Sequence, residues 1–391
     1  MTGLSNEVVM IIRDIQSYVS KSSRKHTSLL LLALLVFFLS PLSHSNLSAG
    51  ESAHFDKSKV QKGCGSCHRG HGILNTSMLP EGRGTFCFRC HASSLSVQEV
   101  RAKGYLSNNI RVADIEKEFN KPYRHPIERT GIHKHGEILP ERDRAIERHV
   151  ECMDCHHHHF ASKNNKAAGI RGISAQGVAV QSIGSEYELC FKCHSTSANL
   201  PGDQKNKAEQ LKSSNPSYHP LVSHGKNNDV PSLIFPLTIS SLIKCTDCHN
   251  NDDPSGPQGP HGSSYRYILK KNYSDTGGTE GPYQYALCYS CHRRESILAN
   301  ESFFYHDLHV SIVGASCRTC HNPHGSTQYS HLIDFDNFTV SPSGKGFTEY
   351  RNLGKRSGEC YLQCHGKDHS PLSYPTKGLK SSSSTRSTLR R

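Results

Sequence analysis

Residues 64–72 read Cys-Gly-Ser-Cys-His-Arg-Gly-His-Gly, and this stretch contains the pattern that decides how the chain folds. Two cysteines separated by two residues and followed at once by histidine are typical of covalent haem attachment. The two thiols add to the two vinyl groups of one porphyrin, and the adjacent histidine binds the iron as proximal ligand. Zinc ribbons, thioredoxin-like sites and disulfide frameworks also use paired cysteines, but none of them requires that histidine.

The same pattern accounts for every cysteine. The 16 cysteines form eight close pairs, and histidine follows the second cysteine of each pair. Seven pairs have the spacing C-x-x-C-H, whereas the eighth has one extra residue between its cysteines. We therefore predict eight covalently attached haems c, or seven if the irregular site is empty; Cys364 alone could also hold the eighth. The attachment residues are Cys64, Cys67, Cys87, Cys90, Cys152, Cys155, Cys190, Cys193, Cys245, Cys248, Cys288, Cys291, Cys317, Cys320, Cys360 and Cys364. The proximal ligands are His68, His91, His156, His194, His249, His292, His321 and His365.

The motifs come in four doublets, and this repetition predicts the domain map. In each repeat a histidine-glycine or similar element follows the first motif, and a spacer then leads to the second motif. We expect a two-haem module from each repeat, preceded by a signal peptide and followed by a basic, Ser/Arg-rich disordered tail. The predicted segments are the signal 1–49, the modules 50–118, 119–207, 208–300 and 301–371, and the tail 372–391.

With these doublets and the CH-x-x-HG element, the chain resembles the doubled-CXXCH family of multihaem cytochromes over about residues 54–370. Members of this family occur in bacteria that respire on metals and other external acceptors. The resemblance implies electron transfer through haems with two histidine ligands. The chain departs from the family pattern in the longer gap between Cys360 and Cys364 and in the run of four histidines at 156–159.

The count of possible axial ligands favours bis-histidine haems. The chain has 27 histidines but only four methionines, and Met78 alone lies outside the signal and the attachment loops. At most one haem can therefore have a methionine ligand. Candidate distal ligands just after the first motif of each repeat are His71, His159, His261 and His324. Candidates upstream of the motifs are His54, His125, His219 and His309. Their rivals are His133, His135, His149, His224, His306, His331 and His369.

The composition gives little material for an ordinary core. Hydrophobic residues make up 35% of the chain, tryptophan is absent, and there are 31 glycines and 18 prolines. Such a chain would fold weakly by itself, whereas porphyrins are large apolar bodies around which it can pack. We expect mostly coil with short α-helices and little or no sheet, in a multihaem cytochrome c fold organised around stacked haems.

The N-terminal segment predicts export. Basic residues precede the apolar run 29–39, which is too short to span a bilayer but suits a secretory signal. We expect a periplasmic or extracellular protein, or one at the cell surface, with no transmembrane span after signal removal. The net charge of +12 does not indicate nucleic-acid binding, because ionised haem propionates would offset most of it.

These observations favour an electron carrier over an enzyme. Iron with both axial positions filled has no site for substrate, so the expected partners are other redox proteins, an outer-membrane electron conduit or further copies of the chain. The alternative is an octahaem reductase of nitrogen or sulfur oxyanions with one open-site haem. No C-x-x-C-K motif occurs, and the irregular Cys360 motif is the one oddity that could mark such a haem. An additional role in building filaments stays open.

Overall fold

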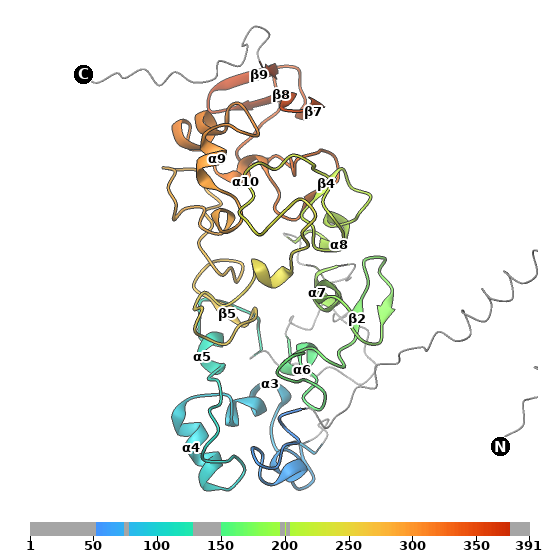
Figure 1. Cartoon of the computed structure of the whole chain (residues 1–391), viewed down its shortest axis with the longest axis vertical. Helices are drawn as coiled ribbons and strands as arrows, with labels where there is room; N and C mark the ends of the chain where they lie inside the picture. Colours follow the sequence, from blue (N-terminus) through green and yellow to red (C-terminus); the bar gives the residue numbers. More distant parts are fainter. Residues whose placement is uncertain (1–51, 74–77, 128–149, 196–199, 201–203, 376–391) are drawn as a thin grey trace, which may run out of the picture. The chain divides into compact units, whose positions relative to one another are not determined.

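The computed structural model describes residues 52–73, 78–127, 150–195, 200 and 204–375 (Figure 1). They all belong to one compact unit, Ser48–Arg391. The predicted signal 1–49 lies outside the described residues, as do residues 376–391 of the predicted tail. The boundaries between the four predicted modules stay predictions.

Short helices separated by coil make up most of the structure, which confirms the predicted fold class. The longest helices, α4 and α7, have nine residues each. The α-helices are α3 Arg83–Phe86, α4 Ser94–Ala102, α5 Glu116–Phe119, α6 Cys152–Cys155, α7 Glu186–His194, α8 Lys207–Gln210, α9 Arg294–Leu298 and α10 Cys317–Cys320. The 3-10 helices are η2 Gly63–Ser66, η3 Cys87–Arg89, η4 Cys245–Asp247 and η5 Cys288–Ser290, and η6 Leu308–Ile312 is a π-helix.

The sheets are small and antiparallel. Three of them pair strands of only two residues each: β1 with β5, β2 with β3, and β4 with β6. The fourth has the order β7-β8-β9 and lies near the C-terminal end of the described chain. The strands are β1 Tyr123–Arg124, β2 Gly172–Ile173, β3 Ala179–Val180, β4 Ser217–Tyr218, β5 Gly262–Ser263, β6 Gly325–Ser326, β7 Glu349–Gly354, β8 Ser357–Cys364 and β9 Lys367–Tyr374.

Each of the seven regular cysteine motifs forms one turn of helix, and in six of them that turn stands nearly alone. Two residues between the cysteines leave room for one turn, which the proximal histidine closes by donating its backbone N–H to the first cysteine's carbonyl. The bond from His68 to Cys64, for example, is 2.9 Å long. The fourth motif lies inside α7, whose N-terminus is capped where Ser185 donates its backbone N–H to the Glu188 carboxylate over 2.9 Å. In the motifs that begin at Cys87, Cys152, Cys245, Cys288 and Cys317, the proximal histidine likewise donates its backbone N–H to the carbonyl of the first cysteine, over 2.9–3.0 Å.

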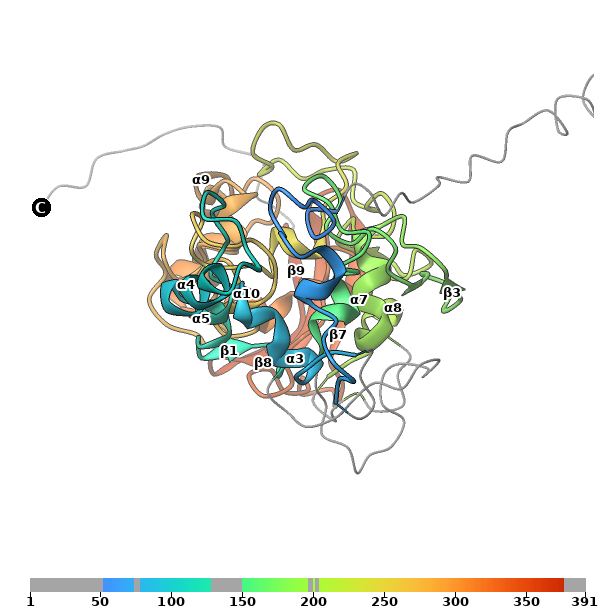
Figure 2. The same cartoon turned by 90° about the horizontal axis from the view of Figure 1, so that it is seen from below.

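Apolar packing between these elements is local. Phe191 of α7 packs with Leu211 and Tyr218 in one small buried cluster, and α7 lies beside α8 in both views (Figures 1 and 2). A second cluster joins Val97 and Val100 of α4 to Leu106. Clusters of this size agree with a fold that needs bound cofactors to complete its interior.

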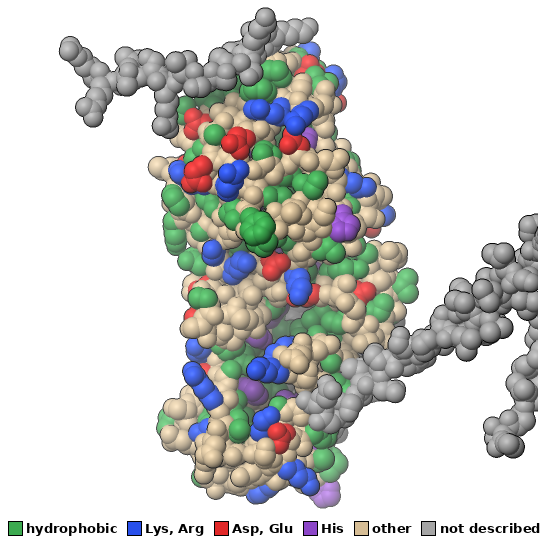
Figure 3. Space-filling view, in the orientation of Figure 1, with side chains coloured by type: hydrophobic (Ala, Val, Ile, Leu, Met, Phe, Trp, Pro, Cys, Tyr) green, Lys and Arg blue, Asp and Glu red, His purple; other side chains and the backbone are tan. Residues whose placement is uncertain are grey.

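The surface carries mixed charge. Figure 3 shows Lys and Arg side chains interspersed with Asp and Glu over one face of the molecule. Within the described part of the chain, no helix has both the length and the apolar character that a membrane crossing requires.

Candidate haem-binding sites

Histidine side chains from distant parts of the sequence meet in pairs. Two imidazoles on opposite faces of one iron have ring centroids about 6 Å apart, because a metal–imidazole bond is about 2.0 Å long. Seven of the eight proximal histidines have a second histidine ring at 5.8–6.4 Å. The eighth, His292, interacts electrostatically with His219. Two ligands are what a porphyrin iron requires, since the macrocycle fills its other four positions.

The proximal histidine of a repeat's first motif pairs with a histidine of the following repeat. The ring of His68 lies 6.2 Å from that of His159, which belongs to the second repeat. The same step joins His156 to His261 over 6.1 Å and His249 to His324 over 6.1 Å. In the second, third and fourth repeats, the histidine that follows the first motif therefore reaches back to the preceding repeat, so consecutive repeats interlock.

The proximal histidine of a repeat's second motif pairs with the histidine that lies upstream of both motifs in the same repeat. His91 lies 6.3 Å from His54, and His194 lies 6.4 Å from His125. His219 stands in the same relation to His292, whose Nδ1 is 2.9 Å from Ser232 Oγ. The spacing of the motifs in the sequence does not reveal this division between neighbouring and same-repeat partners.

The same type of hydrogen bond recurs where a distal candidate upstream of the motifs lies next to a distal candidate that follows a first motif. Nδ1 of His54 donates to the carbonyl of His158 over 3.2 Å, and Nδ1 of His125 donates to that of Pro260 over 2.7 Å. Nδ1 of His219 donates to the carbonyl of Pro323. Each acceptor is the residue just before His159, His261 or His324. A backbone acceptor on Nδ1 fixes the ring and leaves Nε2 for a metal.

Two of the short ladders hold these junctions together. Arg124 of β1, next to His125, pairs with Gly262 of β5, next to His261. Tyr218 of β4 pairs with Gly325 of β6 in the same way. Only glycine fits at position 262 in this close approach, because a Cβ there would stand 1.8 Å from the carbonyl oxygen of Glu118. The glycine of the histidine-glycine element therefore serves the contact between repeats.

His71 differs from its three counterparts. It is exposed, and no other imidazole among the described residues makes a ring contact with it. The expectation that His71 shares an iron with one of the eight proximal histidines is thus not supported by the geometry. Each of its three counterparts lies beside the proximal histidine of the preceding repeat's first motif.

The fourth repeat also departs from the rule. The ring of His321 lies 6.4 Å from His306, which was only a rival candidate in the sequence. Nδ1 of His321 donates to the carbonyl of His331 over 2.9 Å, so His331 contributes through its backbone. No signal in the sequence separates His306 from His309, which lies three residues further on. Of the other rivals, His224 is exposed, and His133, His135 and His149 lie outside the described residues.

Three histidines meet around the irregular motif. The ring of His365 lies 5.9 Å from His309 and 5.8 Å from His369. Nδ1 of His309 donates to the carbonyl of Tyr305 over 2.7 Å, as other distal candidates do to their acceptors. His369 is only 4% exposed, and its Nε2 has no hydrogen-bond partner. This site therefore offers a choice of distal ligand.

Burial keeps the paired imidazoles neutral. It lowers the pKa of His261, His292 and His321 to about 4, and that of His306 to about 3, with smaller contributions from neighbouring histidines. A histidine with such a pKa is unprotonated at neutral pH. Because only the neutral imidazole binds a metal, these rings are ready to bind iron without losing a proton.

Consecutive attachment motifs lie next to one another through their cysteines. The first cysteine of the second motif in one repeat interacts with the first cysteine of the next repeat, in the pairs Cys87–Cys152, Cys190–Cys245 and Cys288–Cys317. Within repeats the second cysteines of the two motifs interact electrostatically, in the pairs Cys67–Cys90, Cys155–Cys193, Cys248–Cys291 and Cys320–Cys364. Cys320 also interacts with Cys360. The motifs thus follow one another in space in the order of the sequence, alternating between these two kinds of contact.

Polar bonds reinforce the same neighbours. The carboxylate of Glu186 at the start of α7 accepts bonds from the backbone N–H and the hydroxyl of Thr246, both 2.8 Å long. This joins the fourth motif to the fifth across the boundary between repeats. Within the second repeat, Lys192 Nζ donates to the carbonyl of Asp154, which joins the fourth motif to the third.

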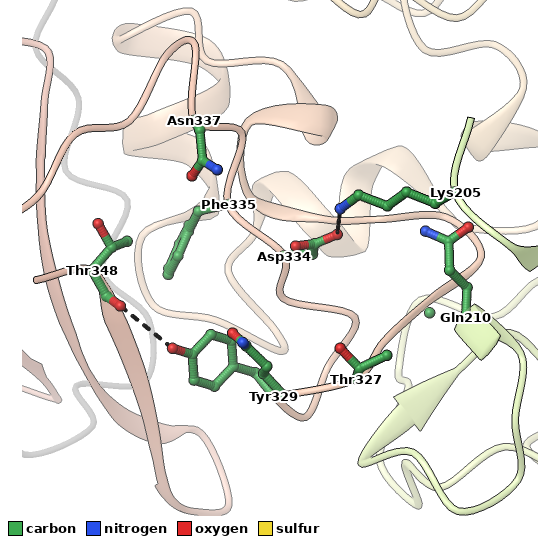
Figure 4. Close-up of a pocket in the computed structure, with 10 residues that line it drawn as sticks. Lys205, Gln210, Thr327, Tyr329, Asp334, Phe335, Asn337 and Thr348 are labelled. Atoms are coloured by element: carbon green, nitrogen blue, oxygen red, sulfur yellow. Dashed lines mark hydrogen bonds and ion pairs between the residues drawn. The ribbon is translucent and has the colours of Figure 1, made fainter. Parts of the chain in front are cut away.

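A cavity of about 300 Å³ lies beside β6 and α8 (Figure 4). Lys205 Nζ and Asp334 Oδ2 are 3.4 Å apart on one side, and the Tyr329 hydroxyl donates to the Thr348 carbonyl over 3.5 Å on another. The residues that line it include Gly325, next to His324, but no cysteine or histidine. It is therefore not one of the attachment sites.

Two protein families match parts of the chain. One, described as the doubled CXXCH motif, matches residues 58–95, and the other, described as cytochrome c-type protein NrfB-like, matches residues 245–337. No curated protein and no solved structure matches the chain. With the cysteine motifs and the paired histidines, these matches define the class: the chain is a multihaem c-type cytochrome with covalently bound haem c, and it transfers electrons. Within that class it carries the doubled CXXCH arrangement.

Proposed function

We propose that the protein holds eight bis-histidine haems and conducts electrons along them in the order of the sequence. One observation carries the proposal: each proximal histidine has a second histidine beside it, in seven cases at the ring separation that a shared iron requires. When bound, each haem takes up or releases one electron at its iron. The paired histidines would hold each haem through its iron and would leave the metal no position for a substrate.

We assign each proximal histidine the neighbouring histidine as its distal partner. In sequence order of the motifs they are His68 with His159, His91 with His54, His156 with His261, His194 with His125, His249 with His324, His292 with His219, His321 with His306, and His365 with His309. His309 is chosen over His369 for the last pair because it occupies the upstream position used in the other repeats. The alternating contacts between motifs support a single row of haems.

The proposed setting is the periplasm or the cell exterior, in a respiratory chain. The N-terminal apolar run supports export, and the mixed surface charge suits brief encounters with other redox proteins. The partners we propose are a soluble electron donor and an outer-membrane electron conduit, or further copies of the chain.

Electron paramagnetic resonance of the fully oxidised holoprotein tests this function. We expect only low-spin ferric signals, because every iron has two strong-field imidazole ligands. A high-spin ferric signal equal to one haem per chain would instead favour the reductase of nitrogen or sulfur oxyanions, which needs an open axial position. The signal would also identify the irregular motif as its source if it disappeared in His365→Ala.

Two histidines at equivalent positions provide a matched pair of variants. His159→Ala removes the ring beside His68, so we expect one haem of eight to become high-spin or to bind added imidazole. His71→Ala alters the same position of the first repeat, where no second imidazole is in contact, and we expect an unchanged spectrum. Equal effects of the two changes would contradict the interlocked ligand pairing.

A further inference from the structure

We infer that the eighth haem is attached through Cys364 alone and that Cys360 remains a free thiol. The inference rests on the proposed haem at this site and concerns how it is bound. It follows from the backbone of the irregular motif, which differs from that of the other seven motifs.

The irregular motif lies on a β-strand. Cys360 and Cys364 both belong to β8, Ser357–Cys364, in the sheet near the C-terminal end of the described chain (Figure 1). Strands rise about 3.3 Å per residue, so cysteines four positions apart have Cα atoms about 13 Å apart. In the regular motifs the cysteines are three positions apart on a helical turn, which separates their Cβ atoms by about 5–6 Å. The seven regular motifs thus present two sulfurs to one porphyrin edge, and β8 does not.

Neighbouring strands hold this stretch extended. Cys360 pairs with Tyr350 on one side and with Leu372 on the other. Gln363 pairs with Asp368 in β9 and exchanges two backbone hydrogen bonds with Ser341, 2.8 and 3.0 Å long. Bringing the two sulfurs to the spacing of a regular motif would break pairs on both edges of β8.

The residues between the cysteines belong in a strand. Tyr361 and Leu362 are 6% and 5% exposed, so both are buried in the sheet, and aromatic residues favour this conformation. Their burial opposes a helical turn at this position.

A tight turn fixes the end of β8. His365 and Gly366 have φ angles of 45° and 73°, and they connect β8 directly to β9. Two consecutive residues with positive φ form the two-residue turn that suits a β-hairpin, and this turn sets the pairing of Cys364 with Lys367. Cys364 therefore sits beside the proximal histidine, whereas Cys360 lies four residues back along the strand.

The attachment chemistry needs only one sulfur. The thiol of Cys364 adds across one vinyl group: its sulfur bonds to the inner vinyl carbon, its hydrogen goes to the outer carbon, and the double bond becomes single. No oxidant or reductant is consumed, and the second vinyl group stays intact. The Cys360 thiol keeps its hydrogen.

Alkylation of the denatured holoprotein with iodoacetamide, followed by intact mass and peptide mapping, tests the inference. We expect eight haems and one alkylated cysteine per chain, located at Cys360. Cys360→Ser should keep eight haems and lose the alkylation, whereas Cys364→Ser should lose one haem. Ser357→Cys, on the same strand, calibrates the labelling and should add one alkylated cysteine.

Each other outcome overturns the inference. No alkylated cysteine means that both sulfurs are attached, so the strand rearranges around the haem. Two alkylated cysteines with seven haems mean that the site is empty, and one alkylated cysteine at Cys364 means that the wrong sulfur was chosen. None of these results changes the low-spin spectrum expected of the other seven haems, so failure here is distinguishable from failure of the proposed function.

Discussion

His125→Met is expected to slow electron passage between the two ends of the protein about a thousandfold while all eight haems stay attached. The ring of His125 lies 6.4 Å from His194, so the change replaces the distal ligand that we propose for the fourth haem. Methionine ligation raises the potential of a haem, and for a one-electron step each 59 mV is a factor of ten. A rise of about 180 mV at this haem would slow the onward step about a thousandfold. In a single row the electron has no route around the fourth haem.

Single-molecule conductance between anchors at the two chain ends measures this effect, and a spectroscopic redox titration shows that one haem has shifted upward. His71→Met is the matched control and should leave conductance unchanged, since it places methionine at an exposed position where no other described imidazole makes a ring contact. If conductance survives His125→Met although one potential has risen, the haems form a branched network and the sequential row is wrong.

Gly325→Ala should destabilise the protein by about 1–3 kcal/mol, the usual range for forcing an extra methyl group into a packed site. A Cβ at Gly325 would stand 2.1 Å from the carbonyl oxygen of Gln210 and 3.0 Å from that of Ser217, both backbone atoms that cannot turn aside. The short β4–β6 ladder would then open. Because His324 precedes this glycine, we also expect the fifth haem to lose its low-spin signal.

Chemical denaturation gives the change in unfolding free energy, and electron paramagnetic resonance gives the spin state. Gly82→Ala is the control, because a Cβ there meets no atom within 4 Å. Equal stability of the two variants would show that the ladder yields without cost and does not hold the distal histidine.

Much of the site could be predicted from local sequence. Attachment depends on residues at most five positions apart, so the cysteines and proximal histidines can be read directly from the spacing. The shortage of methionine indicated bis-histidine ligation for the same reason, since counting needs no geometry. The mostly coil fold followed from a composition that is poor in apolar residues.

The pairing of distal histidines could not be predicted in this way. His68 and His159 are 91 positions apart, and their contact depends on how the second repeat packs against the first. A sequence pattern placed His71 and His159 in one group, although among the described residues only His159 lies beside a proximal histidine. His306 was one of seven rivals, and only the folded chain brings its ring next to that of His321.

The motif at residues 64–72 contains one property that depends on local sequence and another that depends on tertiary structure. The sequence by itself determined that cysteine pairs and their histidines bind haem, because that chemistry is completed within a single turn of backbone. Only the tertiary structure decided that His71 makes no ring contact with another described imidazole, that the motifs follow one another in a row, and that Cys360 lies on a strand. Those properties depend on contacts between repeats and between strands, which form only when segments far apart in the chain come together.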